Sequence, residues 1–334
     1  MHPILKQLSY SAVATLNTRS LQKWSPIDVI IPFHHLVSDE PVPYIQSLYA
    51  FCNSWQFEAG LDYLLRNFQA LTLPEVIQRQ REQEHLRGRQ QHEEPPGHQE
   101  QHQERREQHH GPVSAQLQPF SPPRKKGFLL CFDDGLRQVY EIAAPILLRK
   151  GIPAALFINP SFVDNKEIFY SLQKGWLLHQ LTLLPGGVGG SGSAAGRTEL
   201  LRSAGQLFGR PIHTIAQLGS AIRSINYLNR HLIAQLGALL DLDPEMAMRD
   251  HRPFMTLDQL KELNGKGFAV GAHSMDHPLY SLISPEEQIS QTLRSVRWVS
   301  DNFNQPFKAF AFPHVDTGVG HAFFRQLEIG RAHV

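Results

Sequence analysis

Short apolar runs recur in this chain, and several of them are followed directly by polar side chains. Three runs with the residues after them are 127–132 with Asp133 and Asp134, 268–272 with His273, and 310–312 with Pro313 and His314. Parallel α/β folds bring the carboxyl ends of several strands to one place, where active sites form. The pattern therefore predicts a parallel α/β fold in which these polar side chains share one site.

The segments between the runs carry helix signals. Residues 139–150 are amphipathic and are followed by Gly151, and 154–159 reads as the next strand, which predicts a parallel βαβ unit. The predicted helix N-caps, each with a Glu or Gln three residues later, are Thr72, Thr256 and Ser284. Strands that alternate with helices in this way are typical of a barrel or doubly wound sheet.

The chain has 334 residues, 41% of them hydrophobic, which is enough for one large α/β domain or two smaller ones. The predicted organisation is an N-terminal segment 1–26, a domain 27–327 and a non-native tail 328–334. Within the domain we expect a low-complexity insert 78–112, disordered or loosely helical, and a mostly helical insertion 169–250 with a glycine-rich linker 186–193.

Bulk composition argues against several classes of protein. The net charge is +1, which predicts no nucleic-acid partner, and no apolar run reaches transmembrane length. The two cysteines, Cys52 and Cys131, do not make a disulfide framework. Residues 1–26 lack a secretory signal pattern, so we expect a cytoplasmic protein. Many of the 18 histidines lie in the low-complexity insert and are interpreted as a solvated polar tract.

The aspartate pair and a histidine pair together indicate metal-assisted hydrolysis. His273 and His277 are four residues apart, so one helical turn would place both rings on one face. Two imidazoles and one carboxylate form a facial metal site, and the other carboxylate is left as a base. We expect Gly135 to let the chain turn sharply and direct both carboxylates into one pocket.

Each half of this pattern also has an alternative interpretation. An Asp-Asp-Gly sequence is common as a loop pair that caps a helix, and two histidines at this spacing can be unrelated loop residues. The zinc-protease pattern has the same histidine spacing but requires Glu after the first histidine, where this chain has Ser274.

The motifs in this order resemble those of the polysaccharide deacetylases with a NodB homology domain, carbohydrate esterase family 4. The resemblance rests on 132–135 and 273–277, with 33–35 and the Phe312-Pro313 turn as weaker elements, and it covers the chain from about residue 29 to 320. It implies a distorted, incomplete (β/α) barrel. It also implies an N-acetylated sugar or polysaccharide as the substrate, with acetate as one product.

The resemblance further implies a role for each site residue. Asp134, His273 and His277 would hold a divalent metal, commonly zinc, and Asp133 would be the general base. A backbone N–H near His314, in the turn with Pro313, would bind the oxyanion. Cys131 stands where the family usually has Thr or Ser, and His314 stands where it usually has Tyr.

The family's later Leu-x-His motif, whose histidine protonates the leaving amine, does not appear in this sequence. We therefore expect the catalytic acid to be missing from this chain and assign that role to neither His321 nor His333. Residues 328–334 resemble the translation of a sequencing-adapter oligonucleotide. Two alternatives remain open: a truncated, non-catalytic protein that binds metal or glycan, and an amidohydrolase acting on a small non-sugar C–N bond.

Overall fold

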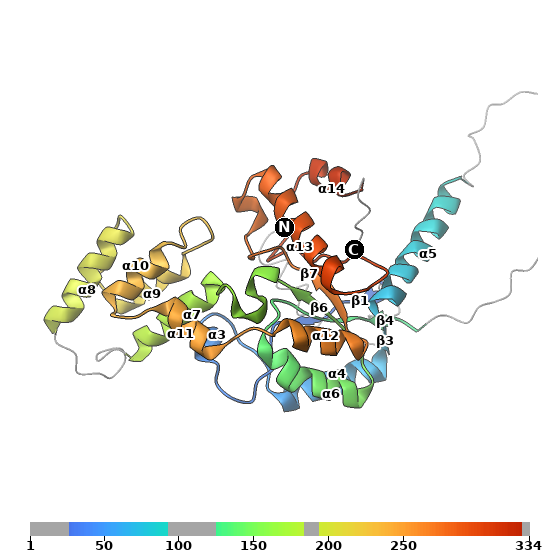
Figure 1. Cartoon of the computed structure of the whole chain (residues 1–334), viewed down its shortest axis with the longest axis horizontal. Coiled ribbons are helices and arrows are strands. Elements are labelled where there is room, and N and C mark those ends of the chain that lie inside the picture. Colours follow the sequence, from blue (N-terminus) through green and yellow to red (C-terminus); the bar gives the residue numbers. More distant parts are fainter. Residues whose placement is uncertain (1–26, 93–124, 184–193, 329–334) are drawn as a thin grey trace, which may run out of the picture.

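The computed structural model describes residues 27–92, 125–183 and 194–328, and Figure 1 shows them as a coloured ribbon. The predicted N-terminal segment 1–26, the glycine-rich linker, most of the low-complexity insert and nearly all of the predicted tail lie outside the described residues. The part of the low-complexity insert that is described is helical, because α5 (Leu73–His92) continues through it.

All of the named strands pair in parallel. Their bounds are β1 (Val29–Ile30), β2 (Phe33–His34), β3 (Gln69–Ala70), β4 (Gly127–Phe128), β5 (Leu130–Phe132), β6 (Ala154–Ile158) and β7 (Ala269–Ala272). They form two sheets, in the orders β1-β4-β3 and β2-β5-β6-β7. The predicted last strand appears only as a bridge between Phe310 and Ala272. Among the described residues the strands do not close into a barrel, which confirms the expectation of a distorted, incomplete one.

The two faces of the larger sheet contact different layers, because successive side chains along a strand point to opposite sides. Phe132, Leu156 and Val270 face a core shared with four helices. These four are α4 (Ser54–Asn67), α6 (Ala144–Lys150), α12 (Leu257–Gly265) and α13 (Pro285–Asn302), and α14 (His321–Glu328) adds Phe323 and Leu327 to the same core. Cys131 and Phe157 face the opposite side, in a cluster that includes apolar residues of α5. The fold therefore has helices on both sides of a parallel sheet.

The predicted helix N-termini are confirmed. The Thr72 hydroxyl accepts from the backbone N–H of Glu75, and Thr256 does the same for Gln259 in a reciprocal capping box. Ser284 accepts from the backbone N–H of Glu287 at the start of α13. The predicted helix 139–150 differs in detail, since its first turn, Val139–Ala143, is π-helical and only then becomes α6. Such caps satisfy backbone groups that have no partner within the helix.

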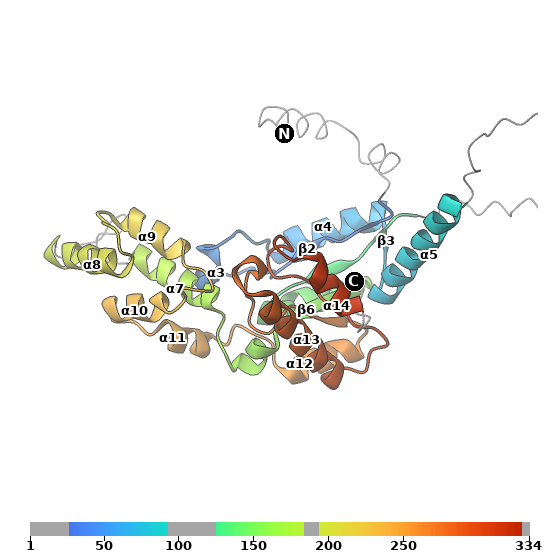
Figure 2. The ribbon, with the colours of Figure 1, turned by 90° about the horizontal axis from the view of Figure 1, so that it is seen from above.

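The described part of the helical insertion has five helices, and the first four of them share an apolar core of their own. They are α7 (Tyr170–Leu183), α8 (Ala194–Leu207), α9 (Ile215–Arg223), α10 (Leu232–Leu239) and α11 (Pro244–His251). Both ribbon views place α8, α9 and α10 at one end of the molecule and α5 at the other (Figures 1 and 2). A second cluster, which includes Ile45, Leu172 and Phe254, joins this lobe to the body through α3 (Pro43–Gln46).

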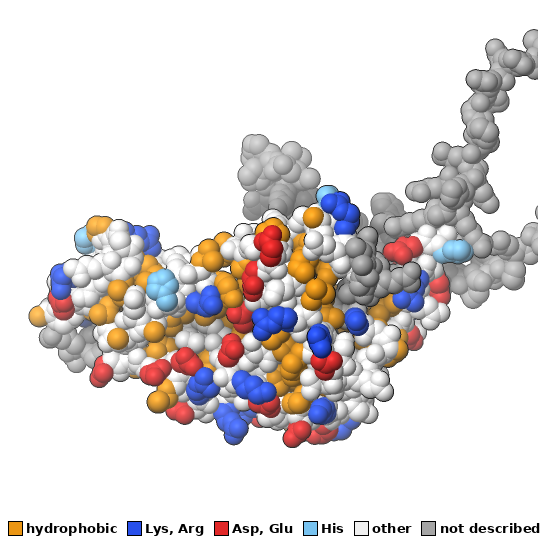
Figure 3. Space-filling view, turned by 45° about the horizontal axis from the view of Figure 1, so that its top comes forward, with side chains coloured by type: hydrophobic (Ala, Val, Ile, Leu, Met, Phe, Trp, Pro, Cys, Tyr) orange, Lys and Arg blue, Asp and Glu red, His pale blue; other side chains and the backbone are white. Residues whose placement is uncertain are grey.

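Three shorter elements complete the described chain. They are the 3-10 segments Pro160–Asn165 and Tyr280–Leu282 and the helix α14 (His321–Glu328). Among the described helices, none is both long enough and apolar enough to cross a bilayer. On the face shown in Figure 3, basic and acidic side chains are interspersed rather than gathered by sign.

Because α7 packs closely on α3, a methyl group added at their contact is expected to lower the stability of the protein. At Gly175 in α7 an added Cβ would overlap the backbone carbonyl of Tyr44, whereas at Gly60 in α4 it would meet nothing within 4 Å. We expect Gly175→Ala to lower the free energy of unfolding by about 1–3 kcal/mol. Gly60→Ala, the matched control, should raise it by about 0.5–1 kcal/mol. Urea denaturation of both variants measures the difference, and equal stabilities would contradict this packing.

Candidate metal centre

Asp134, His273 and His277 come together in one buried cluster. One ligand atom from each residue lies within 4.8 Å of the other two. Asp134 Oδ1 is 3.1 Å from Nε2 of His277 and 3.7 Å from Nε2 of His273. All three side chains are buried. The three residues predicted as metal ligands are therefore the ones that the fold brings together.

The register of the parallel sheet accounts for this convergence. β5 ends at Phe132, just before the aspartates, and β7 ends at Ala272, just before His273. Both strands pair with β6, and the His273 N–H continues the ladder by donating to the carbonyl of Ile158. Strand ends that are far apart in sequence thus meet at one edge of the sheet, as the sequence pattern predicts.

The loop from His273 to His277 is not the helical turn that the spacing suggested. Ser274 and His277 both adopt left-handed backbone conformations, with φ of 62° and 60°. Two such residues fold the loop back on itself, so that the two imidazole ring centroids lie 4.8 Å apart. The two imidazoles lie together as expected, but the helical premise behind that expectation is wrong, since it is the loop conformation that brings the rings together.

The turn after β5 also separates the two aspartates. Asp134 and Gly135 have φ of 70° and 74°, and the Asp134 side chain enters the cluster. Asp133 instead lines an adjoining apolar cavity of about 220 Å³, together with Cys131 and residues of α5 and of the 309–311 segment. The predicted turn is present, but the aspartates lie in adjoining environments rather than in one pocket.

The charge states differ between the two carboxyls. Burial would raise the pKa of Asp134, but the surrounding imidazoles, His277 first, hold it well below its usual range. Burial and then the negative charge of Asp134 raise the pKa of Asp133 to about 7. Burial lowers the pKa of His273 to about 3, so this imidazole is neutral at physiological pH. A neutral imidazole beside an ionised carboxylate is the form in which these groups bind metals.

Hydrogen bonds orient His273 and its loop. His273 Nδ1 lies 2.9 Å from the carbonyl oxygen of Ala311, which can only accept, so Nδ1 carries the proton and Nε2 is free as a ligand. The buried Asn159 amide donates to the backbone carbonyls of His273 and Ser274. The Ser274 hydroxyl accepts from the N–H of His277 at 3.1 Å. These contacts hold the loop rigidly against β6.

The donor set fits a divalent cation. Asp134 Oδ1 is buried and has no hydrogen-bond partner among the described residues, although two imidazole nitrogens face it. One carboxylate oxygen and two imidazole nitrogens this close together are the donor set that a facial metal site requires. Asp134, His273 and His277 would hold the ion.

Two polar residues at the site were not predicted as site residues. His35 Nε2, after β2, lies 3.9 Å from the second oxygen of Asp134, and Asn159, after β6, supports the histidine loop. Both follow apolar strands, so the rule that identified the aspartates also applies to them. His35 was noted only as part of a weak motif, and Asn159 was counted as the last residue of a strand.

His314 lies beside the cluster, as predicted. Its ring centroid is 4.6 Å from that of His277, and its φ of 61° marks a tight turn directly after Pro313. Phe169 covers another side of His277, with ring centroids 4.5 Å apart. The Pro313-His314 turn therefore lies at the edge of the site.

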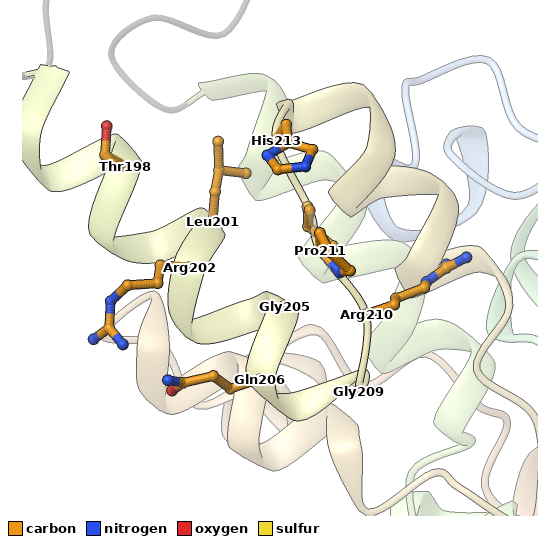
Figure 4. A pocket seen from close by; sticks show the side chains of 10 residues that line it. Thr198, Leu201, Arg202, Gly205, Gln206, Gly209, Arg210, Pro211 and His213 are labelled. Atoms are coloured by element: carbon orange, nitrogen blue, oxygen red, sulfur yellow. The ribbon is translucent and has the colours of Figure 1, made fainter.

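A separate cavity of about 530 Å³ lies on the helical insertion and contains none of the predicted site residues. It is lined by residues of α8 and of the segment that follows, and Figure 4 shows Arg202 and Gln206 on α8 opposite Pro211 and His213. Arg202 is already paired with Glu199, at 2.6 Å.

The fold and the site define a parallel α/β protein with an Asp-His-His cluster suited to a metal ion. Residues 228–319, which include both histidines, match the family described as polysaccharide deacetylase. The match spans less than a third of the chain and ends before its last described residues. The aspartate pair lies outside the matched segment and is joined to it by the geometry of the sheet. A search of curated proteins finds no significant match.

Solved deacetylase structures are also similar to this chain. The deacetylase PplD from Streptococcus pyogenes, in complex with acetate, has 15% identity and a TM-score of 0.46, over 92% of this chain and 81% of that one. IcaB from Ammonifex degensii has 15% identity and a TM-score of 0.45, over 92% and 82%. A de-N-acetylase from Aggregatibacter actinomycetemcomitans has 10% identity and a TM-score of 0.47, over 91% and 85%.

The cluster predicts that the Asp134 carboxylate is needed for the protein to retain a divalent metal ion. Asp134→Ala removes the central donor, and we expect the purified variant to lose the bound divalent ion on dialysis. Asp258→Ala, at an exposed position on α12, is the matched control and should retain it. Metal analysis of both proteins measures the stoichiometry. An Asp134→Ala protein with the metal content of the parent chain would show that the ion binds elsewhere.

Proposed function

We propose that this protein is a metal-dependent hydrolase that removes N-acetyl groups from an N-acetylated glycan. The observation that supports this best is the buried cluster of Asp134, His273 and His277, with the family match over both histidines. We further propose zinc as the ion, because two imidazoles and one carboxylate with open positions are a common zinc donor set.

Within this proposal Asp133 is the general base. It follows β5 directly and is not part of the ligand cluster, so its carboxylate is available to accept a proton. General base catalysis needs a carboxylate close to the attacking water, and Asp133 directly precedes Asp134 of the cluster in the chain. The chemistry that the ion supplies when bound is Lewis-acid polarisation of the amide carbonyl and of the water.

The other residues bind and orient. We propose that the backbone N–H of His314 donates to the oxyanion, since its turn adjoins His277. His35 Nε2 lies 3.9 Å from Asp134 Oδ2, the carboxylate oxygen that does not face His273 and His277. We propose that this contact helps to orient the carboxylate. A rigidly held donor set of this kind loses little energy to reorganisation during the reaction.

The function is tested by acetate release. The zinc-loaded protein should release acetate from oligomers of N-acetylglucosamine, and a chelator should abolish the reaction. Turnover of small non-sugar amides but not of the oligomers would favour the amidohydrolase alternative. Binding of zinc and oligomers without turnover of any amide would favour the non-catalytic alternative.

The base assignment gives a separate prediction. Asp133→Asn keeps the shape of the side chain but cannot accept the proton, so we expect kcat to fall by about 10²–10⁴-fold with the metal content unchanged. Kinetics of acetate release and metal analysis on one preparation provide both values. A variant with the kcat of the parent chain would remove Asp133 from this role.

A further inference from the structure

The helical insertion makes a hydrogen bond to the loop between the two histidines of the proposed metal site. Tyr227, in the connection between α9 and α10, donates its hydroxyl to Asp276 Oδ2 at 2.7 Å. Asp276 directly precedes His277. The lobe that looks separate from the sheet in Figures 1 and 2 is therefore bonded to the residue beside a proposed ligand.

The second oxygen of Asp276 is held from the opposite side. Gln291 on α13 donates Nε2 to Asp276 Oδ1 at 2.7 Å. The same amide accepts from the backbone N–H of Met275, through Oε1 at 2.8 Å. The carboxylate thus bridges the insertion and α13, with the histidine loop held between them.

The loop needs such support because its backbone is strained. Ser274 and His277 are non-glycine residues in left-handed conformations, each of which costs on the order of 1–3 kcal/mol. Conformations of that kind persist only where surrounding contacts fix them. Ser274 and Asn159 fix the first part of the loop, and the Asp276 bridge fixes the part that carries His277.

Tyr227 is itself firmly placed. The guanidinium carbon of Arg230 lies 3.9 Å from the centroid of its ring, and Arg230 Nη1 donates to the Tyr227 carbonyl. The hydroxyl therefore approaches Asp276 from a preorganised side chain, which loses little entropy when the bond forms. The family match begins at residue 228, so Tyr227 lies just outside it, while Asp276 and Gln291 lie inside.

We infer that Tyr227 is a positioning residue for the metal centre, through which the helical insertion holds Asp276, and with it His277, in the ligating conformation. The inference rests on the metal site of the proposed function. It makes the insertion a structural part of that site rather than an appendage to it.

The test is the metal affinity of Tyr227→Phe, measured on the full chain by zinc titration against a chromophoric chelator. Loss of an outer-shell contact typically weakens metal binding by about 10–100-fold, and we expect a loss near the lower end of that range. The Co²⁺ absorption spectrum should also change, because His277 is less firmly oriented. A general loss of stability would lower the melting temperature without changing that spectrum.

Tyr140→Phe is the matched control. Tyr140 also donates to a carboxylate, Glu262 at 2.6 Å, but this bond joins α12 to the segment before α6, away from the histidine loop. It should leave zinc affinity and the Co²⁺ spectrum unchanged.

A double-mutant cycle tests whether Tyr227 acts through Asp276. If it does, the loss in Tyr227→Phe/Asp276→Asn should equal that in Asp276→Asn alone. Additive losses of zinc affinity would overturn the inference. So would a Tyr227→Phe protein with the zinc affinity and Co²⁺ spectrum of the parent chain, or a parent chain that binds neither zinc nor Co²⁺. If Tyr227→Phe weakens zinc binding and the parent chain releases no acetate, the proposed function fails and the inference stands.

Discussion

A buried carboxylate surrounded by imidazoles is the interaction on which this site depends. Asp134 is 6% exposed, and a buried charge costs several kcal/mol unless other groups compensate it. His35, His273 and His277 approach its two oxygens from three separate parts of the chain. The parallel sheet brings these three parts of the chain together at one edge.

Four of the eight non-glycine residues with left-handed backbone among the described residues lie around the same point. Asp134, Ser274, His277 and His314 all have φ between 60° and 70°. Such conformations are unfavourable for side chains with a Cβ, so their clustering marks a site where geometry takes precedence over local preference. The hydrogen bonds of Asn159 and the bridge through Asp276 hold this geometry, which links a lobe of five helices to a small set of ligand atoms.

Local signals predicted the elements well, because caps and strand runs depend on neighbouring residues. Thr256 begins its helix through a capping box, and the apolar run 154–158 is a buried strand, as expected. The prediction of a helical turn between His273 and His277 failed, since spacing alone cannot distinguish a turn of helix from a loop with left-handed residues. Asn159 was missed because its role is to contact backbone carbonyls 114 and 115 residues away.

The sequence by itself determined the chemistry of the donors: two carboxyls after one apolar run and two imidazoles after another. It also determined that the fold is parallel α/β, since the alternation of strand and helix signals is local. Only the tertiary structure decided that Asp134 faces the histidines while Asp133 lines the adjoining cavity, and that Tyr227 reaches Asp276. The reason is physical: the register of β5, β6 and β7 and the turn at Gly135 fix where each side chain points, and no residue spacing encodes that direction.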